Sequence, residues 1–195
     1  SLSHTHTHTL SLSLPSPSPS LPPPQTLQLF LGNAGTATRF LTTACVLPSA
    51  GTTCILTGDP RMHQRPIGDL VDALRANGAS ITCLDEPGCP PLRVDGTGFK
   101  GGDMALDASI SSQFVSSLLI SAPYAREPLR LRLQGDVVSQ PYIDMTIRLM
   151  RTFGASVSVS DDGSTIQVDN KGYTNPEVRF PCVCVCMCVH VCACV

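Results

Sequence analysis

Apolar residues recur along the chain with two different periods, and each period predicts one kind of secondary structure. The clearest helical pattern places four apolar residues on one face: Ile67, Leu70, Val71 and Leu74. Spacings of three and four residues are those of an amphipathic helix. In contrast, Leu and Arg alternate strictly over residues 129–133. Such alternation is typical of a strand with one apolar and one charged face.

The same reasoning predicts strands and helices in a regular order along residues 27–180. Strands are expected at residues 27–31, 53–56, 80–84, 92–94, 104–106, 129–133, 155–159 and 165–168. Helices are expected at residues 35–47, from Pro66 to just before Gly78, at residues 111–122 with Ser109 or Ser111 as the cap, and at residues 141–153. Asp161-Asp162-Gly163 predicts the turn of a final hairpin.

The order strand, helix, strand, helix, strand, strand occurs twice, and single residues repeat with it. Gly58-Asp59, Pro66, Asp69 and Gly78-Ala79-Ser80 recur as Gly135-Asp136, Pro141, Asp144 and Gly154-Ala155-Ser156. The offsets lie between 75 and 77 residues. This internal duplication predicts two pseudo-symmetric units whose helices share one core.

The two ends of the chain differ in composition from the segment between them. All 13 lysines and arginines lie between Arg39 and Arg179. Residues 1–26 have no charged side chain and contain His-Thr and Leu-Ser repeats, whereas residues 182–195 hold six of the ten cysteines, several of them alternating with Val. Translated dinucleotide repeats give such alternations. We therefore expect residues 1–26 to be a disordered low-complexity leader and residues 181–195 to form no native structure.

Metal binding is the alternative explanation for these ends. The His-Thr repeat could bind a metal weakly, and the tail could form a thiolate cluster, although it lacks the Cys-x-x-Cys spacing of zinc knuckles. Leu10 to Leu14 is too short and too interrupted for a signal peptide or a membrane span. Globular composition therefore belongs to residues 27–180.

Charge and cysteine content limit the class of protein further. The formal net charge of −2 gives no support for attraction to nucleic acid or to a membrane surface. Four cysteines lie outside the tail with irregular spacing: Cys45, Cys54, Cys83 and Cys89. In a chain without a credible signal peptide, these are expected to be reduced intracellular thiols.

A turn between the first strand and the first helix is a local candidate for ligand binding. Gly32 and Gly35 flank Asn33 and Ala34, so the backbone can come close to a bound group. Small residues leave the first N–H groups of the next helix uncovered, and such groups attract anions. Arg39 follows one helical turn later. A tight turn that only packs a helix on a sheet is the alternative.

Four motifs occur along the chain in a set order and spacing. They are residues 31–37 (LGNAGTA), 60–70 (PRMHQRPIGDL), 111–113 (SSQ) and 139–142 (SQPY). Together they resemble the EPSP synthase family, the 3-phosphoshikimate 1-carboxyvinyltransferases of the shikimate pathway, which leads to chorismate and the aromatic amino acids. Residues 39–43 and 116–119 are most similar to the EPSP synthase segment of the pentafunctional AROM polypeptide. The resemblance covers roughly residues 27–180.

The resemblance implies an α/β (α+β) fold in which each of two domains holds three βαβαββ units around buried parallel helices. Two such units are expected here, residues 27–100 and 101–180, with their helices buried between sheets. The chain would then supply most of one domain, without the third unit and without the facing domain. Apolar helix faces left exposed in this way would favour aggregation or a molten state.

The resemblance also implies roles for individual residues. Contacts to phosphoenolpyruvate are implied for Asn33, Gly35, Thr36, Arg61 and Gln113, and contacts to shikimate 3-phosphate for Ser111, Ser112, Gln113, Ser139 and Tyr142. Arg61 would be the main phosphate clamp, because a guanidinium can bind phosphate or carboxylate with two parallel hydrogen bonds. No catalytic residue is assigned.

Each of these roles has a purely structural alternative. Ser111 and Ser112 could simply cap a helix, Tyr142 could be a packed core residue, and Arg61 could be an ordinary solvated side chain. The two nearby arginines, Arg39 and Arg65, are expected in structural pairs with anions or carboxylates. His63 is expected to be a loop residue without a catalytic partner.

By resemblance, the reaction transfers the carboxyvinyl group of phosphoenolpyruvate to the 5-hydroxyl of shikimate 3-phosphate. It implies no metal or organic cofactor, and its only partners would be the two small-molecule substrates and the absent second domain. The family's Lys-Ser-x-x-x-Arg motif should lie upstream of residue 27, and its catalytic Asp, Glu and Lys beyond residue 180. Lys100 and Lys171 match neither motif. Because proximity and charge neutralisation need both walls of the site, we expect a fragment that is inactive alone.

Other hypotheses remain at this stage. The chain could be a non-catalytic anion-binding remnant of the fold or the product of a mispredicted gene. It could also be an enolpyruvyl transferase acting on a UDP-sugar, against which residues 111–113 and 139–142 argue. A cytoplasmic location is expected, or a plastid location if a transit peptide is missing.

Overall fold

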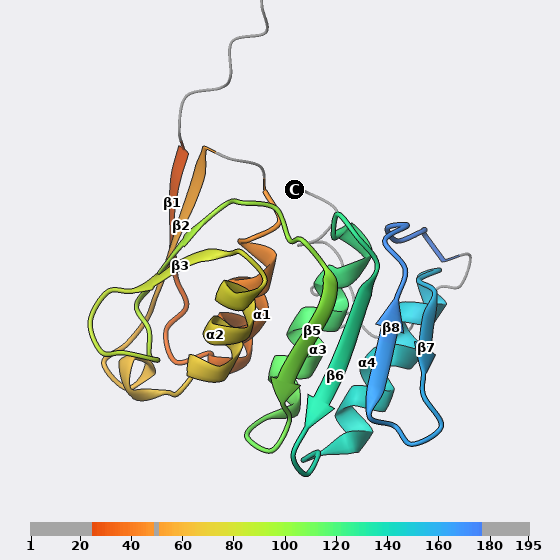
Figure 1. Cartoon of the computed structure of the whole chain (residues 1–195). Coiled ribbons are helices and arrows are strands. Elements are labelled where there is room, and N and C mark those ends of the chain that lie inside the picture. The colour runs from red at the N-terminus through yellow and green to blue at the C-terminus, as the bar shows by residue number, and fades with distance from the viewer. Residues whose placement is uncertain (1–24, 49–50, 177–195) are drawn as a thin grey trace, which may run out of the picture.

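The computed structural model describes residues 25–48 and 51–176, which form two four-stranded sheets with helices packed against them (Figure 1). All but the last two residues of the expected leader, and the whole Cys-Val tail, lie outside the described residues. The fold is mixed α/β, as the sequence predicted.

The first sheet is built by residues up to 95. Its elements are β1 (Gln25–Phe30), α1 (Gly35–Ala44), β2 (Thr52–Thr57), the short 3₁₀ helix η1 (Met62–Gln64), α2 (Gly68–Ala76), β3 (Ser80–Cys83) and β4 (Leu92–Asp95). The strand order is β1-β2-β4-β3. β1 and β2 are parallel, and β4 pairs antiparallel with both β2 and β3.

The second sheet repeats this arrangement. Its elements are β5 (Gly102–Asp107), α3 (Ser112–Ser121), the short 3₁₀ helix η2 (Ala122–Tyr124), β6 (Leu129–Gln134), α4 (Gln140–Thr152), β7 (Val157–Val159) and β8 (Thr165–Val168). The strand order is β5-β6-β8-β7, with β5 and β6 parallel and the other pairs antiparallel. The duplication inferred from the sequence is therefore present in the topology.

The duplication extends to the way in which α2 and α4 end. Gly78 and Gly154 have φ values of +96° and +80°, so each supplies the left-handed residue that terminates its helix. In addition, Arg75 Nε donates to the carbonyl of Ile81 at 2.9 Å, and Arg151 Nη2 donates to that of Val157 at 2.8 Å. The sequence pattern revealed the glycines but not these paired arginines.

Two predicted helix boundaries were wrong by a few residues. α1 ends at Ala44 and not at Leu47. α2 begins at Gly68 and not at Pro66, because the N–H of Ile67 donates to the carbonyl of Gly88 at 2.9 Å. A Cβ on Gly68 would lie only 3.5 Å from the Cα of Gly88. This close backbone contact, between residues far apart in the sequence, fixes the start of the helix.

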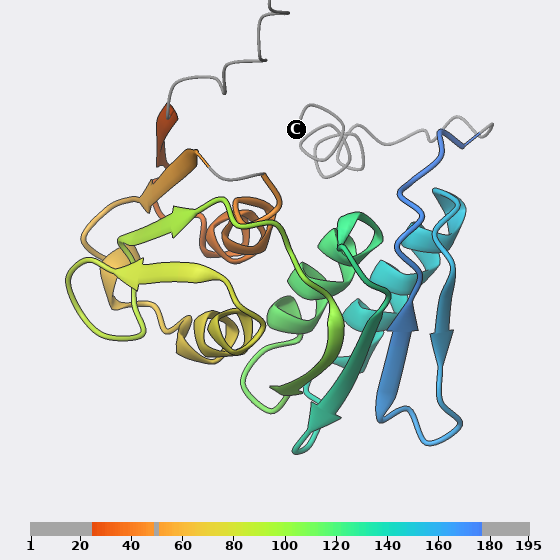
Figure 2. The same cartoon turned by 45° about the horizontal axis from the view of Figure 1, so that its top comes forward.

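The helices of both units share one core, and α3 lies at its centre. α3 packs against both α1 and α4 (Figure 2). Small hydroxyl residues bridge these helices where they meet. Thr43 Oγ1 lies 2.6 Å from Ser117 Oγ, and Ser116 Oγ lies 2.9 Å from Thr146 Oγ1. Because all four hydroxyls are paired, their burial is not penalised, and they tie the end of α1 to the middle of α3 and the middle of α3 to the middle of α4.

The remaining sequence predictions about this part of the chain concern thiols and membranes. Cys45, Cys54, Cys83 and Cys89 are free cysteines. Burial, and then the neighbouring thiol of Cys54, raises the pKa of Cys45, which keeps that thiol protonated. Among the described residues, no helix has the length and apolar content needed to cross a membrane.

Candidate functional site

A cavity of about 530 Å³ lies where α1, α3 and α4 begin. All three helices start at the lower end of the molecule in Figure 1. The lining consists of Thr36, Arg39 and Phe40 from α1, Ile110, Ser111, Ser112, Gln113 and Ser116 around the start of α3, and Val138, Ser139, Tyr142, Met145 and Thr146 around the start of α4. Hydroxyls, one amide and one guanidinium thus meet in a partly apolar hollow.

The charge pattern of the three helix starts favours an anion. None of α1, α3 and α4 has an acidic residue in its first turn. The cap of α1 is Ala34, which makes no side-chain capping hydrogen bond, as the small residues of this turn predicted. Helix N-termini carry partial positive charge and unpaired N–H groups. Three of them at one cavity form a region suited to phosphate or carboxylate.

The start of α3 resolves the question of which serine caps it. Ser111 is the cap, and its Oγ accepts a hydrogen bond from the N–H of Gln113 at 3.2 Å. Ser109, the other candidate, instead donates its hydroxyl to Asp107 Oδ1 at 2.6 Å. Ser112 is 7% exposed, and its hydroxyl has no hydrogen-bond partner among the described residues. A ligand in the cavity could supply that partner.

The start of α4 has an unusual backbone at the residue that lines the cavity. Ser139 has φ +55° and ψ +45°, and among the described residues it is the only non-glycine with positive φ. Such a conformation costs about 1 kcal/mol or more for a residue with a Cβ. Ser139 also makes no side-chain capping hydrogen bond. Tyr142, one turn later, is 62% exposed, so the alternative of a packed core residue was wrong.

A hydrogen-bond chain joins α1 to α3 across the cavity. Arg39 Nη1 donates to Gln113 Oε1 at 2.6 Å, and Gln113 Nε2 donates to Thr36 Oγ1 at 3.0 Å. Arg39 is the only charged residue among the described residues of the lining. Burial, and then the nearby charge of Arg65, lowers the pKa of Arg39, but an arginine remains protonated at any physiological pH.

The comparison with known families agrees with this geometry. The family model for EPSP synthase (3-phosphoshikimate 1-carboxyvinyltransferase) matches residues 8–183. The chain belongs to the EPSP synthase family. The match begins earlier than residue 27, where the sequence motifs had placed the start of the resemblance.

Solved structures of EPSP synthase have the same fold. Two structures of the enzyme from Acinetobacter baumannii, one of them described as a 2.37 Å structure, each superpose with a TM-score of 0.64 at 26% sequence identity. Each comparison covers 77% of this chain and 32% of the other. The chain thus spans about a third of the length of these relatives.

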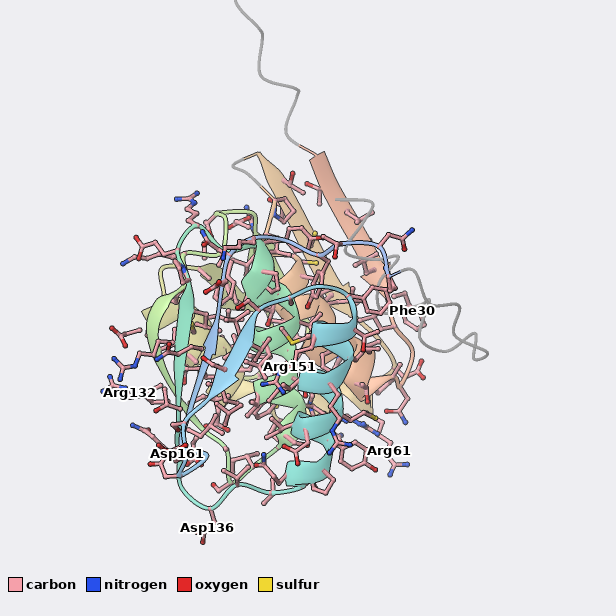
Figure 3. The ribbon with its side chains drawn as sticks, turned by 90° about the vertical axis from the view of Figure 1, so that its right-hand side faces the viewer. Phe30, Arg61, Arg132, Asp136, Arg151 and Asp161 are labelled. Atoms are coloured by element: carbon pink, nitrogen blue, oxygen red, sulfur yellow. The ribbon has the colours of Figure 1, made fainter. Side chains whose placement is uncertain are left out.

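The structure brings together six of the nine residues that the EPSP synthase motifs had indicated. Thr36, Ser111, Ser112, Gln113, Ser139 and Tyr142 line the cavity. Asn33, Gly35 and Arg61 are not part of the lining. Gly35 is buried, and a side chain there would collide with the guanidinium of Arg65. Arg61 is exposed at the start of η1, and Figure 3 shows its side chain at the outer edge of the molecule.

The structure also gives the partners of two further residues, Arg39 and His63. Arg39 was expected in a structural pair with an anion or a carboxylate, yet among the described residues its partners are the Gln113 amide and the carbonyl of Pro66. His63 was expected to be a loop residue without a catalytic partner, and it lies in the short helix η1, outside the cavity lining. Its Nε2 lies 3.3 Å from Thr57 Oγ1 and its Nδ1 lies 3.8 Å from Asp85 Oδ2, both at the surface away from the cavity.

The sequence contained a signal that Arg39 faces the site. Thr36, Arg39 and Thr43 follow one another at helical spacings of three and four residues, so they share one face of α1. That face meets α3 through Thr43 and Ser117. The position of Arg39 one helical turn after the Gly32–Gly35 turn pointed in the same direction, but it did not indicate Gln113 as the partner.

Proposed function

We propose that this chain forms one substrate-binding wall of a 3-phosphoshikimate 1-carboxyvinyltransferase. In the full reaction, the carboxyvinyl group of phosphoenolpyruvate is transferred to the 5-hydroxyl of shikimate 3-phosphate. Family membership supports the reaction type. The observation that carries the proposal for this chain is the cavity in which three helix N-termini without acidic first turns meet Arg39 and several hydroxyls.

Shikimate 3-phosphate is the substrate that the cavity suits better. The residues proposed to contact it, Ser111, Ser112, Gln113, Ser139 and Tyr142, all lie in the lining. Hydroxyls at a helix start can donate to phosphate oxygens while the helix dipole favours the negative charge. Apolar neighbours such as Ile110 and Met145 offer a surface for the carbon ring.

Phosphoenolpyruvate would lie toward the α1 side of the same cavity. Two lining residues that are hydrogen-bonded to each other are proposed to contact it: Thr36 contacts phosphoenolpyruvate, and Gln113 contacts both substrates. Gly35, the residue before Thr36, lies next to the side chain of Arg65. Arg61, on the exposed start of η1, would have to reach over from outside the cavity.

The residues of this wall bind and orient, and they do not carry the proton transfers. Among the described residues, the lining contains no Asp, Glu, His or Lys. General acid–base catalysis most often uses one of these groups within hydrogen-bond reach of the reacting atoms. We therefore propose that the chain binds shikimate 3-phosphate but does not turn over alone, and that a facing domain completes the site. The similarity of residues 39–43 and 116–119 supports an origin in an AROM-type polypeptide.

Two measurements on the purified 195-residue chain test this proposal. Isothermal titration calorimetry should detect saturable binding of shikimate 3-phosphate and much weaker binding of shikimate, which lacks the phosphate. An assay of phosphate release with both substrates present should show no turnover. Equal binding of the two compounds would contradict the phosphate site, and measurable phosphate release would contradict the need for a facing domain.

A further inference from the structure

We propose that Arg39 is a positioning residue that orients the amide of Gln113 and, through it, the hydroxyl of Thr36, so that both present only N–H and O–H donors to the ligand. The inference rests on the proposed function, because it concerns how this cavity recognises an anionic substrate. It adds a residue that the sequence motifs did not include among the ligand contacts.

The first step concerns the orientation of the amide. A guanidinium has donors only, whereas a glutamine amide has one acceptor end and one donor end. Arg39 Nη1 lies 2.6 Å from Gln113 Oε1, so the oxygen is held toward the arginine by a short, charge-assisted bond. The NH₂ group must then point the other way, where Thr36 Oγ1 accepts one of its hydrogens at 3.0 Å. The second hydrogen remains available to a ligand.

The second step concerns the orientation of the Thr36 hydroxyl. Because Thr36 Oγ1 accepts from Gln113, its own hydrogen must point away from the amide. Thr36 is exposed and lines the cavity, and among the described residues its hydroxyl has no acceptor. Arg39, Gln113 and Thr36 therefore form a one-directional chain that ends in donor hydrogens. Donors stabilise phosphate or carboxylate oxygens, whereas a reversed amide would present its carbonyl oxygen to them and repel them.

The third step is that Arg39 itself is held rigidly. Its guanidinium lies over the ring of Phe114, 5.3 Å from the centroid, which is a cation–π arrangement. Its backbone carbonyl accepts from Ser117 Oγ at 2.8 Å. Phe114 and Ser117 are both buried on α3. A side chain anchored to α3 in this way can fix another α3 side chain without itself touching the ligand.

The proximity of a second cation supports the same role. Burial, and then the charge of Arg65, lowers the pKa of Arg39, so a second positive charge lies near Arg39. Among the described residues, neither has an ion pair with a carboxylate. A bound anion would relieve this repulsion, which couples ligand binding to the ordered position of Arg39.

The experiment compares three variants of the full chain. Arg39→Met keeps the apolar stem over Phe114 but removes the guanidinium, and Arg39→Lys keeps the charge but not the planar fork. Arg132→Met is the matched control, since Arg132 is exposed on β6, on the outer face of its sheet (Figure 3). The first readout needs no ligand: the side-chain NH₂ signals of Gln113 in ¹⁵N NMR spectra, assigned with Gln113→Ala.

We expect the Gln113 NH₂ group to be rigid in the wild type and in Arg132→Met. It should be less rigid in Arg39→Lys and mobile in Arg39→Met. Unchanged Gln113 signals in Arg39→Met would overturn the inference. This measurement remains decisive even if shikimate 3-phosphate fails to bind, an outcome that would instead contradict the proposed function.

The second readout is a double-mutant cycle on binding of shikimate 3-phosphate. Arg39→Met should weaken binding about 10- to 100-fold, the range of one charge-assisted hydrogen bond, and Arg39→Lys should restore part of it. In a Gln113→Ala background, Arg39→Met should weaken binding much less, because no amide is left to orient. Fully additive losses would show that Arg39 acts on the ligand directly or on the fold, and would overturn the positioning role.

Discussion

The adjacent serines at the start of α3 allow stability and ligand binding to be separated. Ser111 Oγ accepts from the N–H of Gln113 at 3.2 Å and caps the helix. Removal of such a cap by Ser111→Ala costs about 1 kcal/mol of unfolding free energy. For a domain of this size, that loss lowers the Tm by about 2–4 °C.

Ser112→Ala should weaken binding without the loss of stability expected for Ser111→Ala. Ser112 is 7% exposed and lines the cavity, and its hydroxyl has no partner among the described residues but is not a buried unsatisfied atom, so its removal should leave the stability nearly unchanged. If Ser112 donates to the phosphate, the variant should lose about 1.5–3 kcal/mol of binding free energy. Its affinity for shikimate 3-phosphate would then fall by at least ~10-fold.

A third variant keeps the cap and changes only the charge. Ser111→Asp retains a capping oxygen and adds a negative charge, which is favourable at a helix N-terminus. Its Tm should equal or exceed that of the wild type, while its affinity for shikimate 3-phosphate should fall the most. Thermal unfolding followed by circular dichroism measures the Tm, and calorimetric titration measures the affinity. A Ser112→Ala chain that is less stable than Ser111→Ala, or a Ser111→Asp chain that binds like the wild type, would refute the reasoning.

Three further predictions concern the α1 turn, the first sheet and the reaction. Gly35→Ala should displace the side chain of Arg65, because a Cβ at residue 35 would collide with it. A titration should show weaker binding of phosphoenolpyruvate. The free energy of unfolding should change by less than about 1 kcal/mol, the helical preference of Ala over Gly. Asp95→Asn should destabilise the chain near neutral pH, because hydrogen bonds from Thr53 and then Ser80 outweigh burial and lower the pKa of Asp95. That stabilisation is present above the ordinary carboxyl pKa and is lost as the pH falls through the lowered value, so urea unfolding curves of the two proteins should converge in acid, and a constant gap would contradict the assignment. Addition, as a separate chain, of the part of an EPSP synthase relative that this chain does not span should give phosphate release, and continued inactivity of a mixture shown to form a complex would count against the proposed division of the site.

The fold was predictable because the apolar positions decide it. Ile67, Leu70, Val71 and Leu74 are all buried in the structure, as their helical spacing predicted. The boundaries were less predictable where distant backbone segments meet. Pro66 is a good first residue for a helix, yet the contact of Gly68 with Gly88 delays the start of α2, and no local pattern contains that contact.

The site was predictable in its residues but not in the direction of its side chains. The motifs at residues 111–113 and 139–142 lie at helix starts, where position alone brings them to the cavity. Arginines are long, and their direction depends on what packs beside them. Arg61 is exposed outside the cavity, whereas Arg39 lies over Phe114 and reaches Gln113. Sequence spacing could assign Arg39 to a helix face but not to a partner 74 residues away.

The most direct test of the central claim, that this chain carries one substrate-binding wall of EPSP synthase, is an NMR titration of the ¹⁵N-labelled chain with shikimate 3-phosphate. The account predicts saturable shifts in the backbone amides at the starts of α1, α3 and α4, with Thr36, Gln113 and Tyr142 among them, and little change on β3, β7 or β8. Shifts of similar size with shikimate alone, or shifts that bypass the three helix starts, would contradict it.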